Sequence, residues 1–214
     1  MRLVCMDKVT KAYTGRTILD KYSLNIDSHS RTALTGISGI GKTTLLNLIL
    51  GLAVPDAGTV TLADELNLCV VFQENRLLEQ FCAMDNLDVY PLPFLRSAAT
   101  KLLTAFGLDS FDISDTPGKT ILYRQPVQSF SGGMKRRVAI ARALYGCILY
   151  SNSPSCGEKV LLIMDEPFKG LDTELKIKVM DTVDQVLKST NASLLMVTHE
   201  PEEAAALGCS FINL

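Results

Sequence analysis

Apolar residues in this 214-residue chain fall into short runs separated by polar or glycine-rich turns. Short runs rich in Val, Ile, Leu and Thr predict strands, and the uninterrupted run at 160–164 is typical of a strand buried on both faces. Longer segments without Gly or Pro predict helices. The predicted strands are 2–9, 17–26, 31–35, 59–62, 68–72, 160–164 and 193–198, and the predicted helices are 42–50, 98–106, 135–144 and 173–189.

The order of these elements predicts a single α/β domain over the whole chain, 1–214. We expect a core of about 1–74 and 136–214 with a mostly parallel sheet, and the two opening strands predict an antiparallel edge to it. Residues 75–135 show helical spacing followed by a polar loop at 109–126. This pattern favours a helical subdomain inserted into the core over a separate folding domain.

A glycine-rich segment at 36–44, Gly-Ile-Ser-Gly-Ile-Gly-Lys-Thr-Thr, matches the phosphate-binding pattern G-x-x-x-x-G-K-[ST]. It lies between a predicted strand and a predicted helix, and this context disfavours the alternative of a glycine turn without a ligand. Glycines let backbone N–H groups face a polyphosphate, and the helix N-terminus adds its dipole. Lys42 is then expected to reach the β- and γ-phosphates, and the Thr43 hydroxyl to bind Mg²⁺. The candidate nucleotide-binding residues here are Gly36, Ser38, Gly39, Gly41, Lys42, Thr43 and Thr44.

Two carboxylates follow the buried run at 160–164, where the predicted strand ends. Acids at this end of a parallel strand are costly unless a cation or ligand meets them, and ligands of α/β sheets collect at that edge. Beside a phosphate loop, Asp165 is expected to hold Mg²⁺ and Glu166 to orient an attacking water. The alternative is a strand that ends in a solvated acidic turn. His199 ends the next predicted strand, although a lone histidine is more often structural.

Two further segments carry weaker signals. Ser131 can cap the helix that follows it, and Gly132 and Gly133 would let backbone N–H groups approach an anion. The basic residues at 135–137 oppose the helix dipole, which indicates either a face that meets phosphate or an ordinary solvated face. Tyr13, beside a glycine turn, can stack on a flat base, although a lone tyrosine more often serves packing.

Composition and charge exclude several classes of function. A net charge of −2 leaves no basic excess to neutralise a nucleic-acid backbone, so nucleic acid is not expected as a partner. No run approaches the roughly 18 apolar residues of a membrane span, and the N-terminus has no signal-peptide pattern. Six cysteines are scattered without a C-x-x-C pair, which disfavours metal and secreted disulfide frameworks. We therefore expect an intracellular protein.

Taken together, these motifs resemble those of the ATP-binding-cassette (ABC) ATPases, the nucleotide-binding subunits of ABC transporters, in the family's order over essentially the whole chain. The resemblance implies a P-loop NTPase fold with an ABC-type core, and ATP and Mg²⁺ as ligands. Tyr13 takes the position of the aromatic residue that stacks on adenine. Gln73 takes that of the Q-loop, which touches Mg²⁺ or water and joins the core to the helical subdomain. The 131–133 segment matches the signature motif and Asp172 matches the D-loop.

The resemblance also assigns the chemistry. The 36–44 segment matches the Walker A loop, Asp165 matches Walker B, and Glu166 matches the catalytic carboxylate. His199 matches the switch histidine, which contacts the γ-phosphate in the family. The implied catalytic residues are Glu166, His199, Gln73 and Lys42, and the implied metal ligands are Thr43, Gln73 and Asp165.

Partners and location follow from the same resemblance. In the family, the signature motif of one subunit faces the nucleotide of another, so we expect a head-to-tail dimer with a second copy or a homologous ATPase subunit. An integral-membrane permease is the expected docking partner, and an extracytoplasmic solute-binding protein an indirect one. This implies a cytoplasmic protein that is peripheral at the inner face of the cell membrane.

The branch of the family is indicated by the run at 72–78 and the segment at 130–142, which are similar to the ATPases of bacterial nitrate, sulfonate and taurine importers. The alternatives are an ABC efflux or lipoprotein-export ATPase and, further off, a non-transport ABC protein. A simple P-loop kinase is disfavoured because it has no use for the 131–133 motif. The polar 151–159 segment is longer than the family's usual link and has no assigned role.

Overall fold

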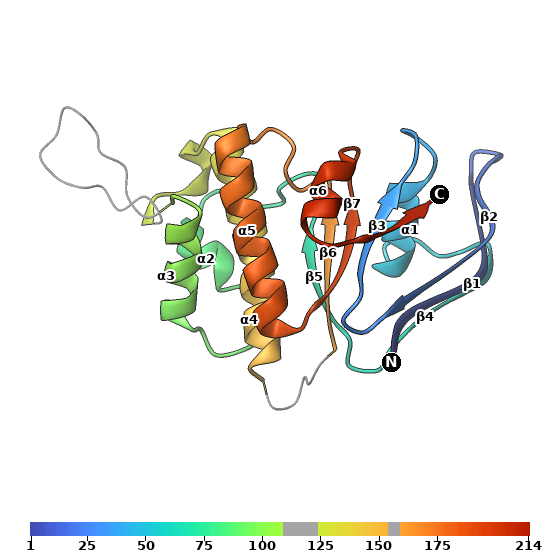
Figure 1. Cartoon of the computed structure of the whole chain (residues 1–214), viewed down its shortest axis with the longest axis horizontal. Coiled ribbons are helices and arrows are strands. Elements are labelled where there is room, and N and C mark those ends of the chain that lie inside the picture. The colour runs from blue at the N-terminus through green and yellow to red at the C-terminus, as the bar shows by residue number, and fades with distance from the viewer. Residues whose placement is uncertain (109–123, 154–158) are drawn as a thin grey trace, which may run out of the picture.

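The computed structural model describes residues 1–108, 124–153 and 159–214. A group of helices, a central parallel sheet and an antiparallel sheet lie side by side, with the antiparallel sheet at the end opposite the helices (Figure 1). Helix α1 (Lys42–Ile49) lies between the two sheets. Within the described ranges, no helix is both long enough and apolar enough to cross a bilayer.

The central sheet is parallel, with the strand order β5-β6-β7-β3-β8. Its strands are β3 (Arg31–Thr35), β5 (Asn67–Val71), β6 (Val160–Asp165), β7 (Ser193–Val197) and β8 (Ser210–Asn213). β6 is buried along its whole length, because Leu161 and Ile163 pack on the α1 side while Leu162 and Met164 pack on the other helices. Since the strands are parallel, the loops after β3, β5, β6 and β7 all leave from one edge of the sheet.

The smaller sheet is antiparallel, with the order β2-β1-β4, and comprises β1 (Arg2–Tyr13), β2 (Arg16–Asp27) and β4 (Ala57–Leu62). Thr14 and Gly15 join β1 to β2, and both have positive φ, 46° and 81°. A two-residue type I′ hairpin requires this conformation at both positions. The turn fixes Tyr13 at the last pair of the β1–β2 ladder, opposite Arg16.

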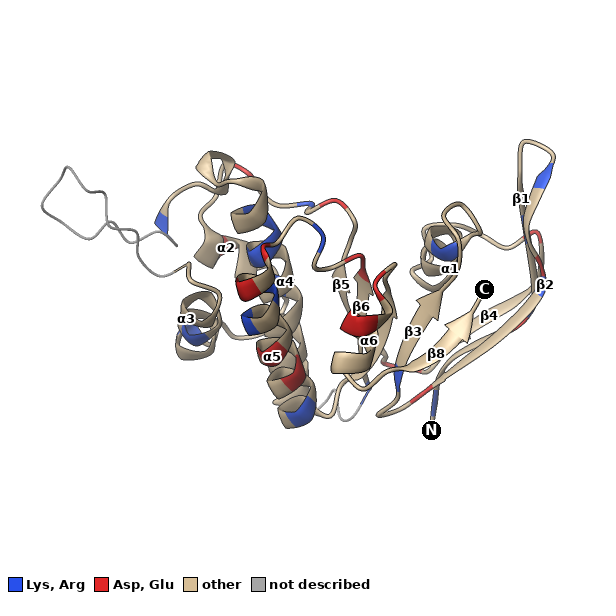
Figure 2. Cartoon of the chain, turned by 45° about the horizontal axis from the view of Figure 1, so that its top comes forward, with Lys and Arg blue, Asp and Glu red and all other residues tan. Residues whose placement is uncertain are grey.

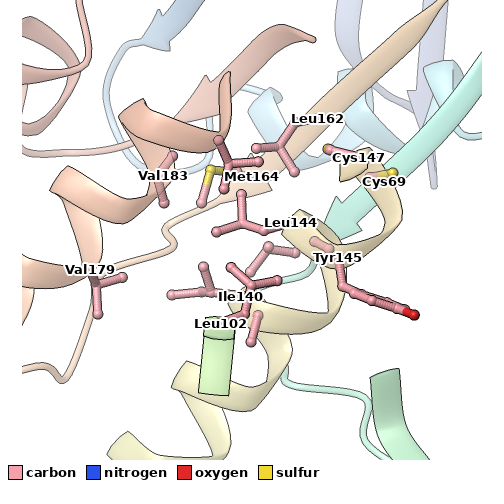
Figure 3. Close-up of a cluster of buried hydrophobic side chains, with 14 of the residues drawn as sticks. Cys69, Leu102, Ile140, Leu144, Tyr145, Cys147, Leu162, Met164, Val179 and Val183 are labelled. Carbon is pink, nitrogen blue, oxygen red and sulfur yellow. The ribbon is translucent and has the colours of Figure 1, made fainter. Parts of the chain in front are cut away.

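The remaining helices lie on the other side of the parallel sheet from α1. They are α2 (Ala83–Leu87), α3 (Arg96–Ala105), α4 (Gly132–Ser151), α5 (Thr173–Thr190) and α6 (Pro201–Ala206), with a 3-10 turn η2 at Val127–Ser129. α4 packs on the strands β5 and β6, and α2, α3 and α5 pack on α4. Its Ile140 and Leu144 lie in a buried cluster with Leu162, Met164 and Val183 (Figure 3). This cluster fixes α4, and therefore its N-terminus, against the strand that ends in Asp165.

The structure confirms the predicted α/β class with a parallel sheet and antiparallel opening strands, which form a sheet of their own with β4 and not an edge of the parallel sheet. It adds α2, α6 and β8, which the hydrophobic pattern did not predict. These three elements are too short to show a period. The predicted loops at 109–126 and 151–159 fall mostly outside the described residues. The division into a core of 1–74 and 136–214 and a helical subdomain of 75–135 stays a prediction, and α4 crosses its second boundary.

Candidate functional site

The glycine-rich 36–44 segment forms the turn between β3 and α1. Gly36, Gly39 and Gly41 have φ values of 145°, 77° and 121°, which residues with a Cβ rarely adopt. At Gly41, a Cβ would also approach the Ile18 side chain to 2.8 Å, so both conformation and packing require glycine. Glycines in such conformations allow successive N–H groups to face one side of a turn, where they can meet an anion.

Lys42 is the first residue of α1 and is only 6% exposed. Its ammonium donates hydrogen bonds to the carbonyls of Gly36 (2.8 Å) and Ile37 (3.0 Å), so the side chain folds back along the turn. The charge therefore lies beside the positive end of the α1 dipole. Together, the ammonium and the helix N-terminus form an anion-binding site.

Asp165, the last residue of β6, is 6% exposed. Burial raises the pKa of Asp165 above its ordinary value, and the neighbouring charge of Glu166 adds to this effect. The charges of Arg136 and Lys42, and a hydrogen bond with Thr43, act in the opposite direction. A carboxylate beside a hydroxyl supplies the oxygen ligands that Mg²⁺ prefers. In the described parts of the chain, no group of three or more His, Cys, Asp or Glu residues is placed to hold a metal ion.

Glu166 has an uncommon backbone conformation for a residue with a side chain, with φ of 45°. Its N–H donates to the carbonyl of Val197 (2.9 Å), which fastens this turn to β7. One carboxylate oxygen lies 3.1 Å from Nε2 of His199, and the other lies 3.0 Å from Nζ of Lys169. Such backbone conformations cluster at functional sites, and here the turn brings Glu166 into contact with His199.

A cleft of about 250 Å³ collects most of the predicted site residues. It is lined by Tyr13, Ile18, Ser38, Gly39, Gly41, Lys42, Thr43, Thr44, Gln73, Asp165, Glu166, Val197 and His199. Tyr13 is 44% exposed, and the Lys11 ammonium lies 5.2 Å from the centre of its ring. Figure 2 colours the basic and acidic positions along the ribbon, with blue on α1 and red near the end of β6. The cleft thus combines a cationic turn, two carboxylates and an exposed aromatic ring.

Ser131, Gly132, Gly133 and Asp172 do not line this cleft. The side chains of Ser131 and Asp172 accept hydrogen bonds from N–H groups in the first turns of α4 (3.3 Å) and α5 (3.0 Å), so both act as helix caps. A Cβ at Gly132 would meet nothing within 4 Å, which means that this face of α4 is open. Their predicted contact with a nucleotide stays a prediction.

Arg136 and Lys169 belong to the site, but the sequence did not single them out. The sequence left two alternatives for the basic residues at 135–137, a face that meets phosphate or a solvated face. Both are wrong for Arg136, because its side chain is buried, with 5% of the residue exposed. Its guanidinium instead donates to the main-chain carbonyls of Asp165 (2.8 Å) and Glu166 (2.7 Å). Arg136 stands between two other basic residues in the sequence, so nothing local indicates its burial or its acceptors.

Comparison with known proteins gives matches over most of the chain. The model of a family described as ABC transporter matches residues 19–169. An Fe(3+) ions import ATP-binding protein of Pectobacterium atrosepticum is 32% identical over 93% of this chain and 56% of its own length. In Paraburkholderia xenovorans, an aliphatic sulfonates import ATP-binding protein is 33% identical over 92% of this chain and 70% of its own length. A Nod factor export ATP-binding protein of the same organism is 34% identical over 94% and 64%. The chain spans little more than half the length of the first of these relatives.

A solved structure extends the similarity to the fold. The ATP-binding cassette MJ0796, in a dimeric post-hydrolysis state bound to ADP and Pi, matches with a TM-score of 0.75 and 26% identity, over 99% of this chain and 94% of that chain. The matched family range contains the glycine-rich turn and both carboxylates at the end of β6. The fold class and the family resemblance are thus confirmed, and the chain belongs to the ABC transporter family, whose ATP-binding cassettes are ATPases.

Proposed function

We propose that this chain binds and hydrolyses ATP, with Mg²⁺, to power the import of a solute through a separate membrane permease. The observation that carries the proposal is the convergence of Lys42, Thr43, Asp165, Glu166 and His199 on one cleft. These residues come from the loops after β3, β6 and β7, at the edge where α/β sheets bind ligands. The similarity to import ATP-binding proteins supports the transport role.

The nucleotide is held mainly by the glycine-rich turn. Its N–H groups and the Lys42 ammonium bind the β- and γ-phosphates in place of the carbonyls that Lys42 now contacts. Thr44 and Ser38 line the same cleft and complete the phosphate contacts. The exposed ring of Tyr13 stacks on the adenine, since an aromatic side chain at the mouth of a cleft can cover a flat base.

Hydrolysis needs an oriented water and stabilisation of the charge that develops on the γ-phosphate. Glu166 orients the water, and His199, 3.1 Å from the carboxylate, contacts the γ-phosphate. Thr43, Gln73 and Asp165 would hold Mg²⁺, whose charge offsets that of the phosphates. Gln73 also lines the cleft and can contact the water or the ion.

A second subunit is needed to close the site. The cleft is open to solvent, and the 131–133 motif of the same chain does not reach it. We infer that this motif and Asp172 close over the nucleotide of a second copy or a homologous ATPase subunit, head to tail. The dimeric form of the MJ0796 cassette supports such an arrangement.

The location follows from the permease. We place the chain in the cytoplasm, peripheral at the inner face of the membrane, where it docks on the permease near the exposed Leu78 and Phe81. An extracytoplasmic solute-binding protein would deliver the solute to that permease. Nucleic acid is not a proposed partner, because the net charge is −2.

The test is Mg²⁺-dependent ATP hydrolysis by the purified chain and by Lys42→Ala. Loss of charge-assisted hydrogen bonds of about 1.5–3 kcal/mol should weaken ATP binding roughly 10- to 150-fold, with the cooperative thermal transition kept. Lys178→Ala is the matched control, because Lys178 is exposed and pairs only with Glu174 (2.7 Å) among the described ion pairs. Equal ATP affinity and hydrolysis in Lys42→Ala and in wild type would refute the proposed site.

Export is the second candidate, favoured by the 34% identity to a Nod factor export ATP-binding protein. The neighbouring genes separate the two: a gene for a solute-binding protein beside a permease gene indicates import. Vesicles reconstituted with that permease then give the direction directly. ATP-driven accumulation on the side of the ATPase supports import, and movement away from it supports export.

A further inference from the structure

Arg136 lies on α4, five residues after the Ser131 cap, and is 5% exposed. Its Nη1 donates to the main-chain carbonyls of Phe72 and Gln73 (3.3 Å to Gln73), in the loop that follows β5. The same nitrogen lies 3.4 Å from Oδ1 of Asn75. One side of the guanidinium therefore holds the loop that brings Gln73 to the nucleotide cleft.

The other nitrogens of Arg136 hold the loop that follows β6. Nη2 donates to the carbonyls of Asp165 (2.8 Å) and Glu166 (2.7 Å), and Nε donates to that of Pro167 (2.7 Å). β5 and β6 are neighbouring strands, so these two loops lie side by side at the edge of the sheet. A single side chain thus sets the spacing between the Gln73 loop and the Glu166 loop.

These contacts use the planar fork of an arginine. Five N–H donors in fixed directions on three nitrogens can serve carbonyls on two loops at once, whereas a lysine has three donors on a single nitrogen. Burial lowers the pKa of Arg136 to about 10, and the charges of Asp165 and Glu166 oppose this shift, so the group stays charged at neutral pH. Its hydrogen-bond acceptors among the described residues are main-chain carbonyls and one side-chain amide oxygen.

Helix α4 also links Arg136 to the 131–133 motif. The helix begins at Gly132, immediately after Ser131, and runs without a break past Arg136. A helix moves as a rigid unit over one to two turns, so a displacement of the 131–133 motif displaces the Arg136 backbone with it. Both loops bonded to the guanidinium would then move, and with them the side chains of Gln73 and Glu166.

We propose that Arg136 is a positioning residue that connects the 131–133 motif to the Gln73 and Glu166 loops, so that closure over a partner's nucleotide aligns the chain's own catalytic carboxylate. The proposal rests on the proposed function, because it needs the 131–133 motif to close over a second nucleotide. It makes hydrolysis at the two sites of a dimer interdependent. Arg136 itself touches neither nucleotide nor water.

Arg137 provides the matched comparison. It follows Arg136 on α4, and its guanidinium also donates to main-chain carbonyls, those of Phe106, Gly107 (3.4 Å) and, one turn back on its own helix, Gly133 (3.4 Å). Phe106 and Gly107 lie at the end of α3, and none of the three acceptors lines the nucleotide cleft. Loss of Arg137 should therefore weaken the packing of α3 on α4 without a change in the spacing of the two cleft loops.

The experiment compares the ATP dependence of hydrolysis for wild type, Arg136→Met, Arg136→Lys and Arg137→Met. Misplacement of a catalytic group by about 1 Å can cost roughly 100-fold in rate, so kcat of Arg136→Met should fall by about that factor. Its half-saturating ATP concentration should stay within about twofold, and its Hill coefficient should fall from above one to one. Arg136→Lys, which keeps the charge without the fork, should recover only part of kcat.

A purely structural role predicts a different result. In that case, Arg136→Met and Arg137→Met would lose thermal stability to a similar extent, and each folded molecule would keep the wild-type kcat and Hill coefficient. This result would overturn the proposal. If Arg136→Met does not fold, wild-type kcat and Hill coefficient in Arg136→Lys overturn it equally. Failure of the proposed function is distinct, because wild type itself would then show no Mg²⁺-dependent hydrolysis.

Discussion

Two glycine motifs in this chain precede helices, yet they are built differently. In the turn before α1, Gly36, Gly39 and Gly41 have positive φ, and the turn is enclosed by the charged residues of the cleft. In the motif before α4, Gly132 and Gly133 have ordinary helical backbone, and a Cβ at Gly132 would face open space. We call the turn at 36–44 the phosphate-binding cradle, because its backbone is already bent into the conformation that can face an anion. The 131–133 motif is instead an exposed surface.

Each motif has a different place in the proposed site. The turn before α1 has a cation, two carboxylates and a histidine of the same chain beside it in the cleft. The motif before α4 is a capped helix N-terminus, whose N–H groups and dipole favour an anion. In the proposed function, the exposed motif of one chain therefore completes the cleft of another.

We expect the greatest change in activity from Glu166→Gln. This variant should impair hydrolysis while leaving nucleotide binding by the glycine motifs intact. The substitution removes the negative charge that we propose orients the water, so kcat should fall by about 10²- to 10⁴-fold. ATP affinity, measured by equilibrium titration, should stay at the wild-type value, since Lys42 and the turn are unchanged. The control is Glu202→Gln, an exposed residue of α6, which should hydrolyse ATP like wild type. Undiminished hydrolysis in Glu166→Gln would contradict the assignment.

The same substitution in each glycine motif tests the comparison directly. Gly41→Ala places a Cβ at φ 121° and 2.8 Å from Ile18, with strain of about 1–3 kcal/mol, and should weaken ATP binding roughly 5- to 150-fold. Gly132→Ala has space and helical backbone, so the ATP affinity and unfolding free energy of the monomer should stay within about 0.5 kcal/mol of wild type. Equal losses of ATP affinity in the two variants would break the distinction between cradle and surface.

Asp184→Asn should change only the stability of the fold, and by the least. Asp184 lies in neither glycine motif and does not line the cleft. Hydrogen bonds from Lys188 (2.7 Å), followed by Arg31 (2.7 Å), hold the pKa of Asp184 below its ordinary value. A carboxyl whose pKa is lower in the folded state stabilises the protein when the pH is above its pKa in the unfolded chain, about 3.9. This stabilisation is lost as the pH falls through the pKa of the folded state. We expect a loss of about 0.5–1 kcal/mol at pH 7 that shrinks below about pH 4, measured by chemical unfolding.

The control for the pH dependence of Asp184→Asn is Glu174→Gln, because Glu174 forms an exposed ion pair with Lys178. Glu174→Gln removes an ion pair with Lys178 whose side chains are largely exposed, so its unfolding free energy should match wild type more closely. A pH-independent loss in Asp184→Asn would contradict the ion-pair explanation.

The cradle could be predicted from the sequence because its physics is local. Glycines, lysine and threonine at fixed spacing determine the turn, and a run such as 160–164 is typical of a parallel sheet that helices cover on both faces. The edge rule of parallel sheets then places Asp165, Glu166 and His199 together without knowledge of their contacts. Their common position in the cleft agrees with that prediction, while their roles stay proposals.

Contacts between distant segments could not be predicted in this way. Arg136 appeared as one of three basic residues in a first helical turn, and its acceptors are supplied by the loops after β5 and β6, which no spacing on α4 reveals. Lys169 lies only three residues after its partner Glu166, but the sequence does not indicate the positive φ that Glu166 adopts in the turn between them. The short α6 and β8 were missed because a few residues cannot show a hydrophobic period.

We propose that one chain carries a phosphate-binding cradle and an exposed motif that become a working site only in a pair. The direct measurement is the mass of Glu166→Gln in solution, by size-exclusion chromatography with light scattering, in ATP and in ADP. Because this variant binds ATP without splitting it, we predict a species of twice the 23.4 kDa chain mass with ATP and a monomer with ADP. A monomer in both nucleotides at high protein concentration, with ATP bound, would contradict the claim.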